Sequence, residues 1–177
     1  YIGDLIGGNV SLSQVDRRIT QGVAAVLDAP EEVLAQYEEW YGTEGENALL
    51  AQFLDPNADL IDLANKAGAA AAGGYAQRIL GSGIDESMAT DIADLDYTNQ
   101  QLYQAYTALA QQTALFAEKA GEQDFDITEE GVEYALNLDH ETITDLEERR
   151  RSRIADFSGG GGALMSGTTT GFGSANA

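Results

Sequence analysis

The 177-residue sequence contains no cysteine, one histidine, two prolines and only two lysines. The absence of cysteine excludes disulfides, thiolate metal sites and thiol nucleophiles. No apolar run approaches the ~18 residues that a membrane-spanning helix needs, so we expect no membrane span. No signal peptide opens the sequence, and its first residue is Tyr1 rather than methionine. We expect the chain to be the C-terminal portion of a longer protein.

Basic residues are scarce, because 9 Lys and Arg stand against 30 Asp and Glu, giving a formal net charge of −21. Such a surface repels the phosphates of nucleic acids and anionic membranes, so we expect no direct nucleic-acid binding. It suits a basic partner instead. The hydrophobic content of 44% is typical of a folded chain, and this length is enough to bury a core.

Helix signals dominate the sequence and strand signals are almost missing. Ser11 with Gln14, and Thr98 with Gln101, form two capping boxes that satisfy the free N–H groups of a helix start. Pro30 lies where another helix is predicted to begin, and Gly42 where that helix is predicted to end. Apolar residues follow at spacings of three and four. We therefore predict an all-α fold, an irregular bundle of about six or seven helices over residues 1–157.

Further helix features are more specific. Asp55 is predicted to cap a long helix with Pro56 in its first position. Within that helix, residues 67–74 (AGAAAAGG) have almost no side-chain bulk. They either let a neighbouring helix approach closely or form a weak, kinked helix. The first helix carries one apolar face, formed by Leu12, Val15, Ile19, Val23 and Val26.

The sequence offers one candidate metal site, but it lacks two of the residues that a calcium loop requires. Asp55, Asn57 and Asp59 have the D-x-N-x-D spacing of a calcium loop. That loop needs glycine at its sixth position and a bidentate glutamate at its twelfth, and Leu60 and Lys66 stand there. We expect no metal site.

Catalytic candidates are equally weak. The acidic clusters at 91–96 (DIADLD) and 124–130 (DFDITEE) could hold an acid/base pair, but 30 acidic residues produce such clusters by chance. His140 follows Asp139, which is predicted to start the last helix, and no serine is marked as its partner. No nucleotide-binding loop or hydrolase motif is present. We expect no catalytic residue and no cofactor, so the sequence does not indicate an enzyme.

Four arginines gather within five residues at 149–153, nearly half of the basic residues of the chain. Two interpretations are open. Pairing with Glu147 and Glu148, together with the negative C-terminal end of a helix, accounts for part of the cluster. Alternatively, the cluster is presented to an acidic neighbour, in particular another copy of this chain, since arginine binds carboxylates bidentately.

Residues 158–177 are rich in Gly, Ser and Thr and are predicted to form an extended arm. The arm has few bulky apolar side chains and cannot build a core of its own. It either binds a neighbouring subunit or folds back on its own domain. We predict a subunit interface made by the arginine cluster and these side chains: Arg149, Arg150, Arg151, Arg153, Phe157, Leu164, Met165 and Phe172.

Three stretches, in this order, resemble the C-terminal half of virion structural proteins of tailed bacteriophages. They are NVSLSQVDRRI (9–19), FLDPNADLIDLANKAGAAAAG (53–73) and LEERRRSRIADFSGGGGALMSGTTTGFGSA (146–175). The resemblance implies a neck, tail or internal, ejection-type protein present in many copies. It implies a homo-oligomer whose partners are its own copies and other virion proteins, located in the virion after assembly in the host cytoplasm.

Three classes of function follow from these features. The first is a structural virion component that acts through subunit contacts. The second is an assembly or scaffolding partner, because acidic helical chains can fill a particle temporarily. The third, remote class is a small acidic hydrolase or metal enzyme.

Overall fold

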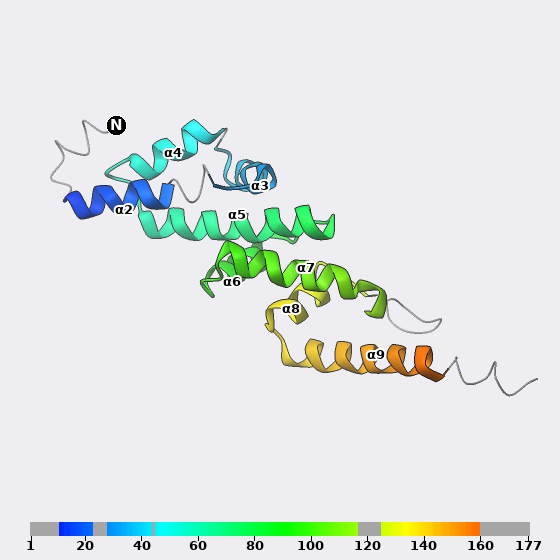
Figure 1. The fold of residues 1–177 in the computed structure, drawn as a ribbon. Coiled ribbons are helices and arrows are strands. Elements are labelled where there is room, and N and C mark those ends of the chain that lie inside the picture. Colours follow the sequence, from blue (N-terminus) through cyan, green and yellow to red (C-terminus); the bar gives the residue numbers. More distant parts are fainter. Residues whose placement is uncertain (1–10, 23–27, 44, 117–124, 160–177) are drawn as a thin grey trace, which may run out of the picture.

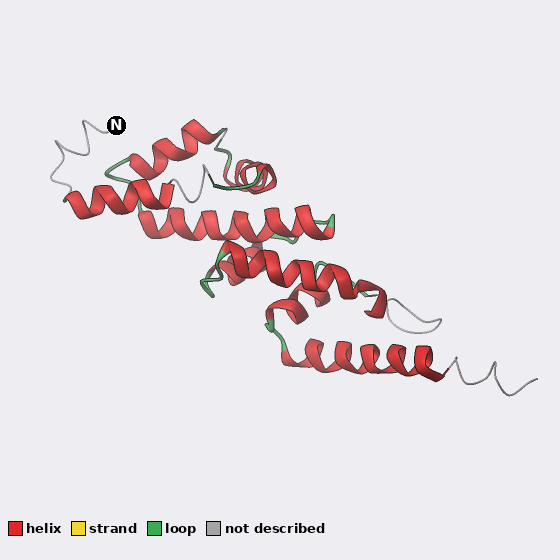
Figure 2. Ribbon diagram, viewed as in Figure 1, coloured by secondary structure: helices red, strands yellow, loops and turns green. Residues whose placement is uncertain are grey.

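The computed structural model describes residues 11–22, 28–43, 45–116 and 125–159. Within these ranges it has eight helices and no strand, so the all-α prediction is confirmed, with slightly more helices than expected (Figures 1 and 2). The helices are α2 (Leu12–Gly22), α3 (Glu31–Tyr41), α4 (Glu46–Leu54), α5 (Leu60–Leu80), α6 (Glu86–Ala93), α7 (Asn99–Phe116), α8 (Glu130–Leu136) and α9 (His140–Gly159).

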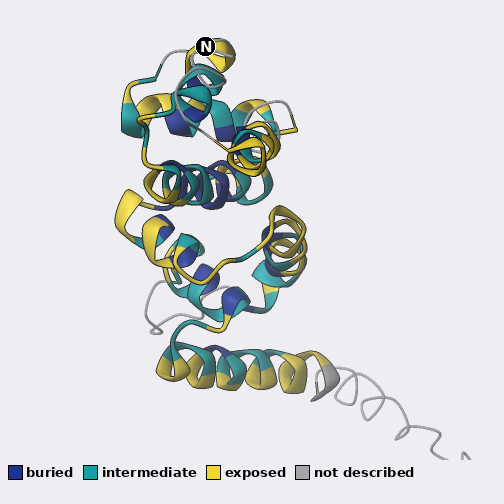
Figure 3. Ribbon diagram, turned by 90° about the vertical axis from the view of Figure 1, so that its left-hand side faces the viewer, coloured by how far each residue is buried: buried dark blue, intermediate teal, exposed yellow. Residues whose placement is uncertain are grey.

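The helices stack in successive layers rather than around one axis (Figure 1). Helix α5 is central, with α3 and α4 packed on one side and α6 and α7 on the other. Helix α2 packs against α4, while α8 and α9 follow α7 and contact each other. Burial is concentrated in α5 and on the inner faces of its neighbours, whereas α9 forms the outermost layer and is largely exposed (Figure 3).

The local helix starts follow the sequence. In the first capping box the Ser11 N–H donates to Gln14 Oε1 at 3.1 Å, and the Gln14 N–H donates to Ser11 Oγ at 3.3 Å. The second box repeats this exchange between Thr98 and Gln101, at 2.9 and 3.3 Å. Pro30 directly precedes α3, whose stop at Gly42 uses the left-handed conformation (φ 67°) that glycine adopts without strain.

The start of α5 differs from the prediction. Asp59, not Asp55, caps the helix, and its Oδ1 accepts from the backbone N–H groups of Ile61 and Asp62 at 2.9 and 3.4 Å. Asp55 instead accepts from the Asn57 N–H at 2.9 Å and ends α4. The predicted start with Pro56 in the first helical position was wrong because residues 55–58 form a turn held by a distant arginine.

That arginine is Arg18, which is 8% exposed although it lies on the surface helix α2. Its guanidinium donates to four backbone carbonyls at the end of α4 and in the turn after it. The distances are 3.3 Å to Phe53, 2.7 Å to Asp55, 3.2 Å to Pro56 and 3.1 Å to Ala58. The planar guanidinium group, with its several N–H donors, suits four carbonyl acceptors arranged around it. Arg18 thereby fixes the α4–α5 connection and the position of α2.

The apolar face predicted for the first helix is not a core face throughout. Leu12 is 85% exposed and Ile19 is also exposed, while the buried residues of α2 are Arg18 and Gly22. A Cβ at Gly22 would lie 3.0 Å from Leu50 Cδ1 and from Phe53 Cβ. Helix α2 therefore approaches α4 through its polar and small residues. Val23 and Val26 lie outside the described residues.

The small-residue run of α5 does let a neighbouring helix approach closely. Ala69 to Gly74 are all buried, and α3 crosses α5 there. A Cβ at Gly73 would lie 2.5 Å from Trp40 Cη2, and one at Gly74 would lie 2.5 Å from Val33 Cα and 2.6 Å from Val33 N. The close-packing interpretation is confirmed, because at Gly74 the main chains of the two helices touch.

The acidic surface leads to a prediction about salt. Raising NaCl from about 0.01 M to about 1 M shortens the screening length from about 30 Å to about 3 Å. Because this weakens repulsion within a chain of net charge −21, we expect the melting temperature to rise. Thermal circular dichroism measures it, and NaCl is used because sulfate also strengthens apolar burial. A melting temperature that is flat or falls over this range would contradict the prediction.

Candidate subunit interface

Helix α9 carries the arginine cluster, and its start is firmly anchored. The Thr142 N–H donates to Asp139 Oδ2 at 2.7 Å, so Asp139 caps the helix as its place in the sequence predicts. This hydrogen bond lowers the pKa of the Asp139 carboxyl. The Thr142 hydroxyl also donates to Glu133 Oε2 of α8 at 2.9 Å. These bonds tie the beginning of α9 to α8.

The second half of α9 is much less covered than the first. Among the described α9 side chains, Leu146 alone is buried. Beyond it, Ile154 is 46% exposed and Phe157 is 78% exposed. Helix α9 ends at Gly159, two residues past the predicted domain boundary. An exposed phenylalanine on an outer helix is the kind of side chain that anchors contacts between proteins.

The structure bears on the first interpretation of the arginine cluster at Arg151. Arg151 Nη2 lies 2.9 Å from Glu147 Oε2 one helical turn away, as predicted for a self-paired face. In contrast, Arg149 Nη1 and Arg150 Nε are buried and have no hydrogen-bond partner within the described part of the chain. Each of these two side chains therefore keeps one donor that the described residues leave unsatisfied.

We call Arg149, Arg150, Arg151, Arg153 and Phe157 the basic end of α9. All five predicted interface residues in this segment lie within about three helical turns of one another. The remaining three predicted interface residues, Leu164, Met165 and Phe172, lie outside the described residues, so their role stays a prediction. The basic end is at the outer edge of the molecule (Figures 1 and 3).

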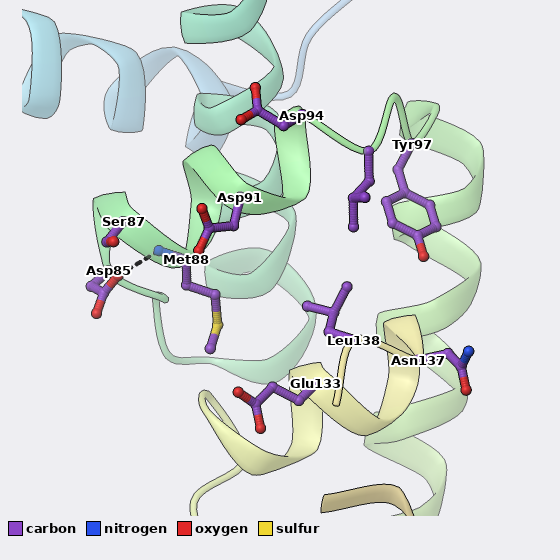
Figure 4. A pocket seen from close by; sticks show the side chains of 10 residues that line it. Asp85, Ser87, Met88, Asp91, Asp94, Tyr97, Glu133, Asn137 and Leu138 are labelled. Atoms are coloured by element: carbon purple, nitrogen blue, oxygen red, sulfur yellow. Dashed lines mark hydrogen bonds between the residues drawn. The ribbon is translucent and has the colours of Figure 1, made fainter. Parts of the chain in front are cut away.

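A second feature is an acidic cavity of about 670 Å³ between α6 and α8 (Figure 4). Asp85 and Asp91 of the α6 segment, Asp94 after it and Glu133 of α8 line this cavity, with apolar side chains between them. Two of the four carboxylates come from the sequence cluster at 91–96. Sequence reasoning missed the cavity because Glu133 and Leu138 reach it only through the fold, and no sequence spacing links them to α6.

Two of the other chemical candidates in the sequence, Asp126 and Asp59, have structural uses. In the cluster at 124–130, Asp126 Oδ1 accepts from the Thr128 hydroxyl at 2.6 Å and its N–H at 2.8 Å, which lowers the pKa of Asp126. Asp59 caps α5, and His140 is exposed at the start of α9. Among the described residues, no three His, Asp or Glu side chains are grouped to hold a metal ion.

Comparison with protein families, curated proteins and solved structures found no match for this chain. The helices of the described segments are too short or too polar for any of them to cross a lipid bilayer.

Proposed function

We propose that this chain is a structural component of a tailed-phage virion, in the neck, the tail or the interior, that acts through contacts between subunits. The observation that carries the proposal is the basic end of α9. It places four of the nine basic residues and a 78%-exposed phenylalanine at one edge of a molecule whose net charge is −21.

The basic end of α9 suits assembly for two physical reasons. Copies of a chain with this net charge repel one another unless positive charge is concentrated where they meet. Arginine and large aromatic residues are also the types that dominate the binding energy of protein interfaces. The resemblance of residues 9–19, 53–73 and 146–175 to virion structural proteins supports the virion as the location.

The first test is the native mass of the assembly. We expect the full chain to form an oligomer in light scattering or native mass spectrometry. A chain shortened to residue 148 loses the whole proposed interface but keeps the buried Leu146. We expect it to be a monomer with the helical circular dichroism of the remaining helices preserved. A monomeric full chain, or a shortened chain that assembles equally well, would contradict the proposal.

A second measurement separates a virion component from a scaffolding protein. A structural component persists in purified, DNA-filled particles, and a scaffold leaves before they are complete. We expect peptides of this chain in the purified particles at a constant ratio to the other virion proteins. Their loss during maturation would favour the scaffolding function.

A further inference from the structure

The basic end of α9 has a defined binding face. Arg150, Arg153 and Phe157 follow the buried Leu146 at intervals of four, three and four residues, so all four lie on one side of the helix. Leu146 packs into the domain, whereas Phe157 extends the same stripe beyond the core. The stripe runs about 10 Å from Arg150 to Phe157 along the helix axis. It offers two positive charges followed by an aromatic anchor.

The acidic cavity has the complementary pattern. Asp85, Met88 and Asp91 lie at intervals of three on one face of α6, and Leu138 projects toward Met88 from the segment after α8 (Figure 4). Asp91 and Glu133 lie on either side of the Met88 side chain. The acidic row from Asp85 to Asp94 spans about 13 Å along α6. An apolar floor edged by carboxylates fits a helix that carries both arginine and phenylalanine.

The carboxylates of the cavity lack positive partners of their own. None of the residues that line it is basic. The side-chain carboxylates of Asp91 and Asp94 make no hydrogen bond or ion pair within the described ranges. Of the other two, Asp85 caps α6 by accepting from the Met88 N–H at 2.7 Å, and Glu133 accepts from Thr142. The cavity therefore concentrates uncompensated negative charge around apolar side chains.

One molecule cannot fill its own cavity with this stripe. Leu138 lines the cavity, and α9 begins two residues later at His140. Phe157 is 17 residues farther along that helix, which places it about 26 Å away along the axis. In Figure 1 the end of α9 points away from α6 and α8. A contact between the two surfaces must therefore join different molecules.

We infer that the α9 stripe of one subunit docks into the acidic α6–α8 cavity of the next copy. Phe157 packs on Met88 and Leu138, and Arg150 and Arg153 pair with carboxylates at the rim. This inference rests on the proposed function, because it takes the basic end of α9 as a contact between subunits. The contact joins two different surfaces, so it is head-to-tail, and repeating it builds a ring or a filament.

Two variants of the full chain test the pairing. The stripe variant carries Arg150→Glu and Phe157→Ser, and the cavity variant carries Asp91→Asn and Asp94→Asn, so that the two altered surfaces do not attract each other. We expect each alone to associate about 100-fold more weakly, since each removes the centre of the contact. Mixed in equal amounts, they retain one intact stripe and one intact cavity. We expect a complex of two chains that grows no further, measured by native mass spectrometry.

The controls separate docking from folding and from general charge effects. Circular dichroism must show unchanged helix content for both variants. The matched control carries Arg17→Glu and Ile61→Ser, which make the same kinds of change at exposed positions on α2 and α5. We expect it to assemble like the unaltered chain.

The outcomes distinguish this inference from the proposed function. If only the stripe variant loses assembly, the basic end of α9 binds a surface other than the cavity. That result would overturn the cavity as the docking site and leave the proposed function standing. If the two variants do not pair when mixed, the head-to-tail contact is wrong. If the unaltered chain is itself a monomer, the proposed function fails as well.

Discussion

Replacing Gly74 with alanine is expected to lower the free energy of unfolding by about 2–3 kcal/mol, the cost of overpacking a tight core. The added Cβ would lie 2.5 Å from Val33 Cα and 2.8 Å from the Glu32 carbonyl carbon. These are main-chain atoms of α3, so no side-chain rotation relieves the clash. The two helices must move apart, and the contacts along their crossing loosen.

The sign of this effect makes it diagnostic. In an exposed helix, replacing glycine with alanine stabilises by about 1 kcal/mol. Thermal or urea unfolding of Gly74→Ala is compared with Asn65→Ala, an exposed position on the same helix. We expect the second change to be neutral or mildly stabilising. A Gly74→Ala chain as stable as the unaltered one would show that α3 and α5 do not cross this closely.

Replacing Arg18 with methionine is expected to cost about 2–4 kcal/mol, because hydrogen bonds from a charged group are lost and their acceptors are stranded. Four carbonyls between Phe53 and Ala58 lose their guanidinium donor. The turn before α5 loosens, and α2 loses its main buried contact. Unfolding by urea measures the stability, and faster hydrogen exchange at residues 55–62 locates the effect.

Arg17 provides a control for this prediction. It is the preceding residue, with the same charge and the same helix, but it is exposed. We expect Arg17→Met to change stability by less than about 0.5 kcal/mol, as surface substitutions usually do. Arg18→Lys should restore only part of the loss, since an ammonium group cannot spread over four acceptors as a guanidinium does. Equal effects at the two positions would mean that Arg18 acts only through its charge.

The features that sequence reasoning predicted correctly are short-range. The capping boxes at Ser11 and Thr98 join residues three apart, and the glycine stop of α3 at Gly42 depends on one backbone conformation. The same is true of Asp139 and of the Arg151–Glu147 pair. Each involves atoms within four residues, whose relative position a helix fixes. The net charge and the basic cluster at 149–153 likewise follow directly from the amino-acid sequence.

The features that sequence reasoning missed or misplaced involve distant residues. Arg18 binds carbonyls 35 to 40 positions along the chain, which turned the predicted cap at Asp55 into a turn and moved the start of α5 to Leu60. Leu12 and Ile19 looked like core residues because their spacing is helical. They are exposed because α2 meets α4 through Arg18 and Gly22 instead.

The candidate interface shows the same division. The sequence by itself determined that the chain is helical, that it is acidic overall, and that its basic residues gather at 149–153. Composition is a property of the sequence alone, and local hydrogen bonding depends only on neighbouring residues. Only the tertiary structure decided that Phe157 is exposed while Leu146, on the same side of α9, is buried, and that Asp91 and Glu133 edge one cavity. Those juxtapositions arise from packing between helices, and packing depends on the shapes of surfaces that the chain brings together only when it folds.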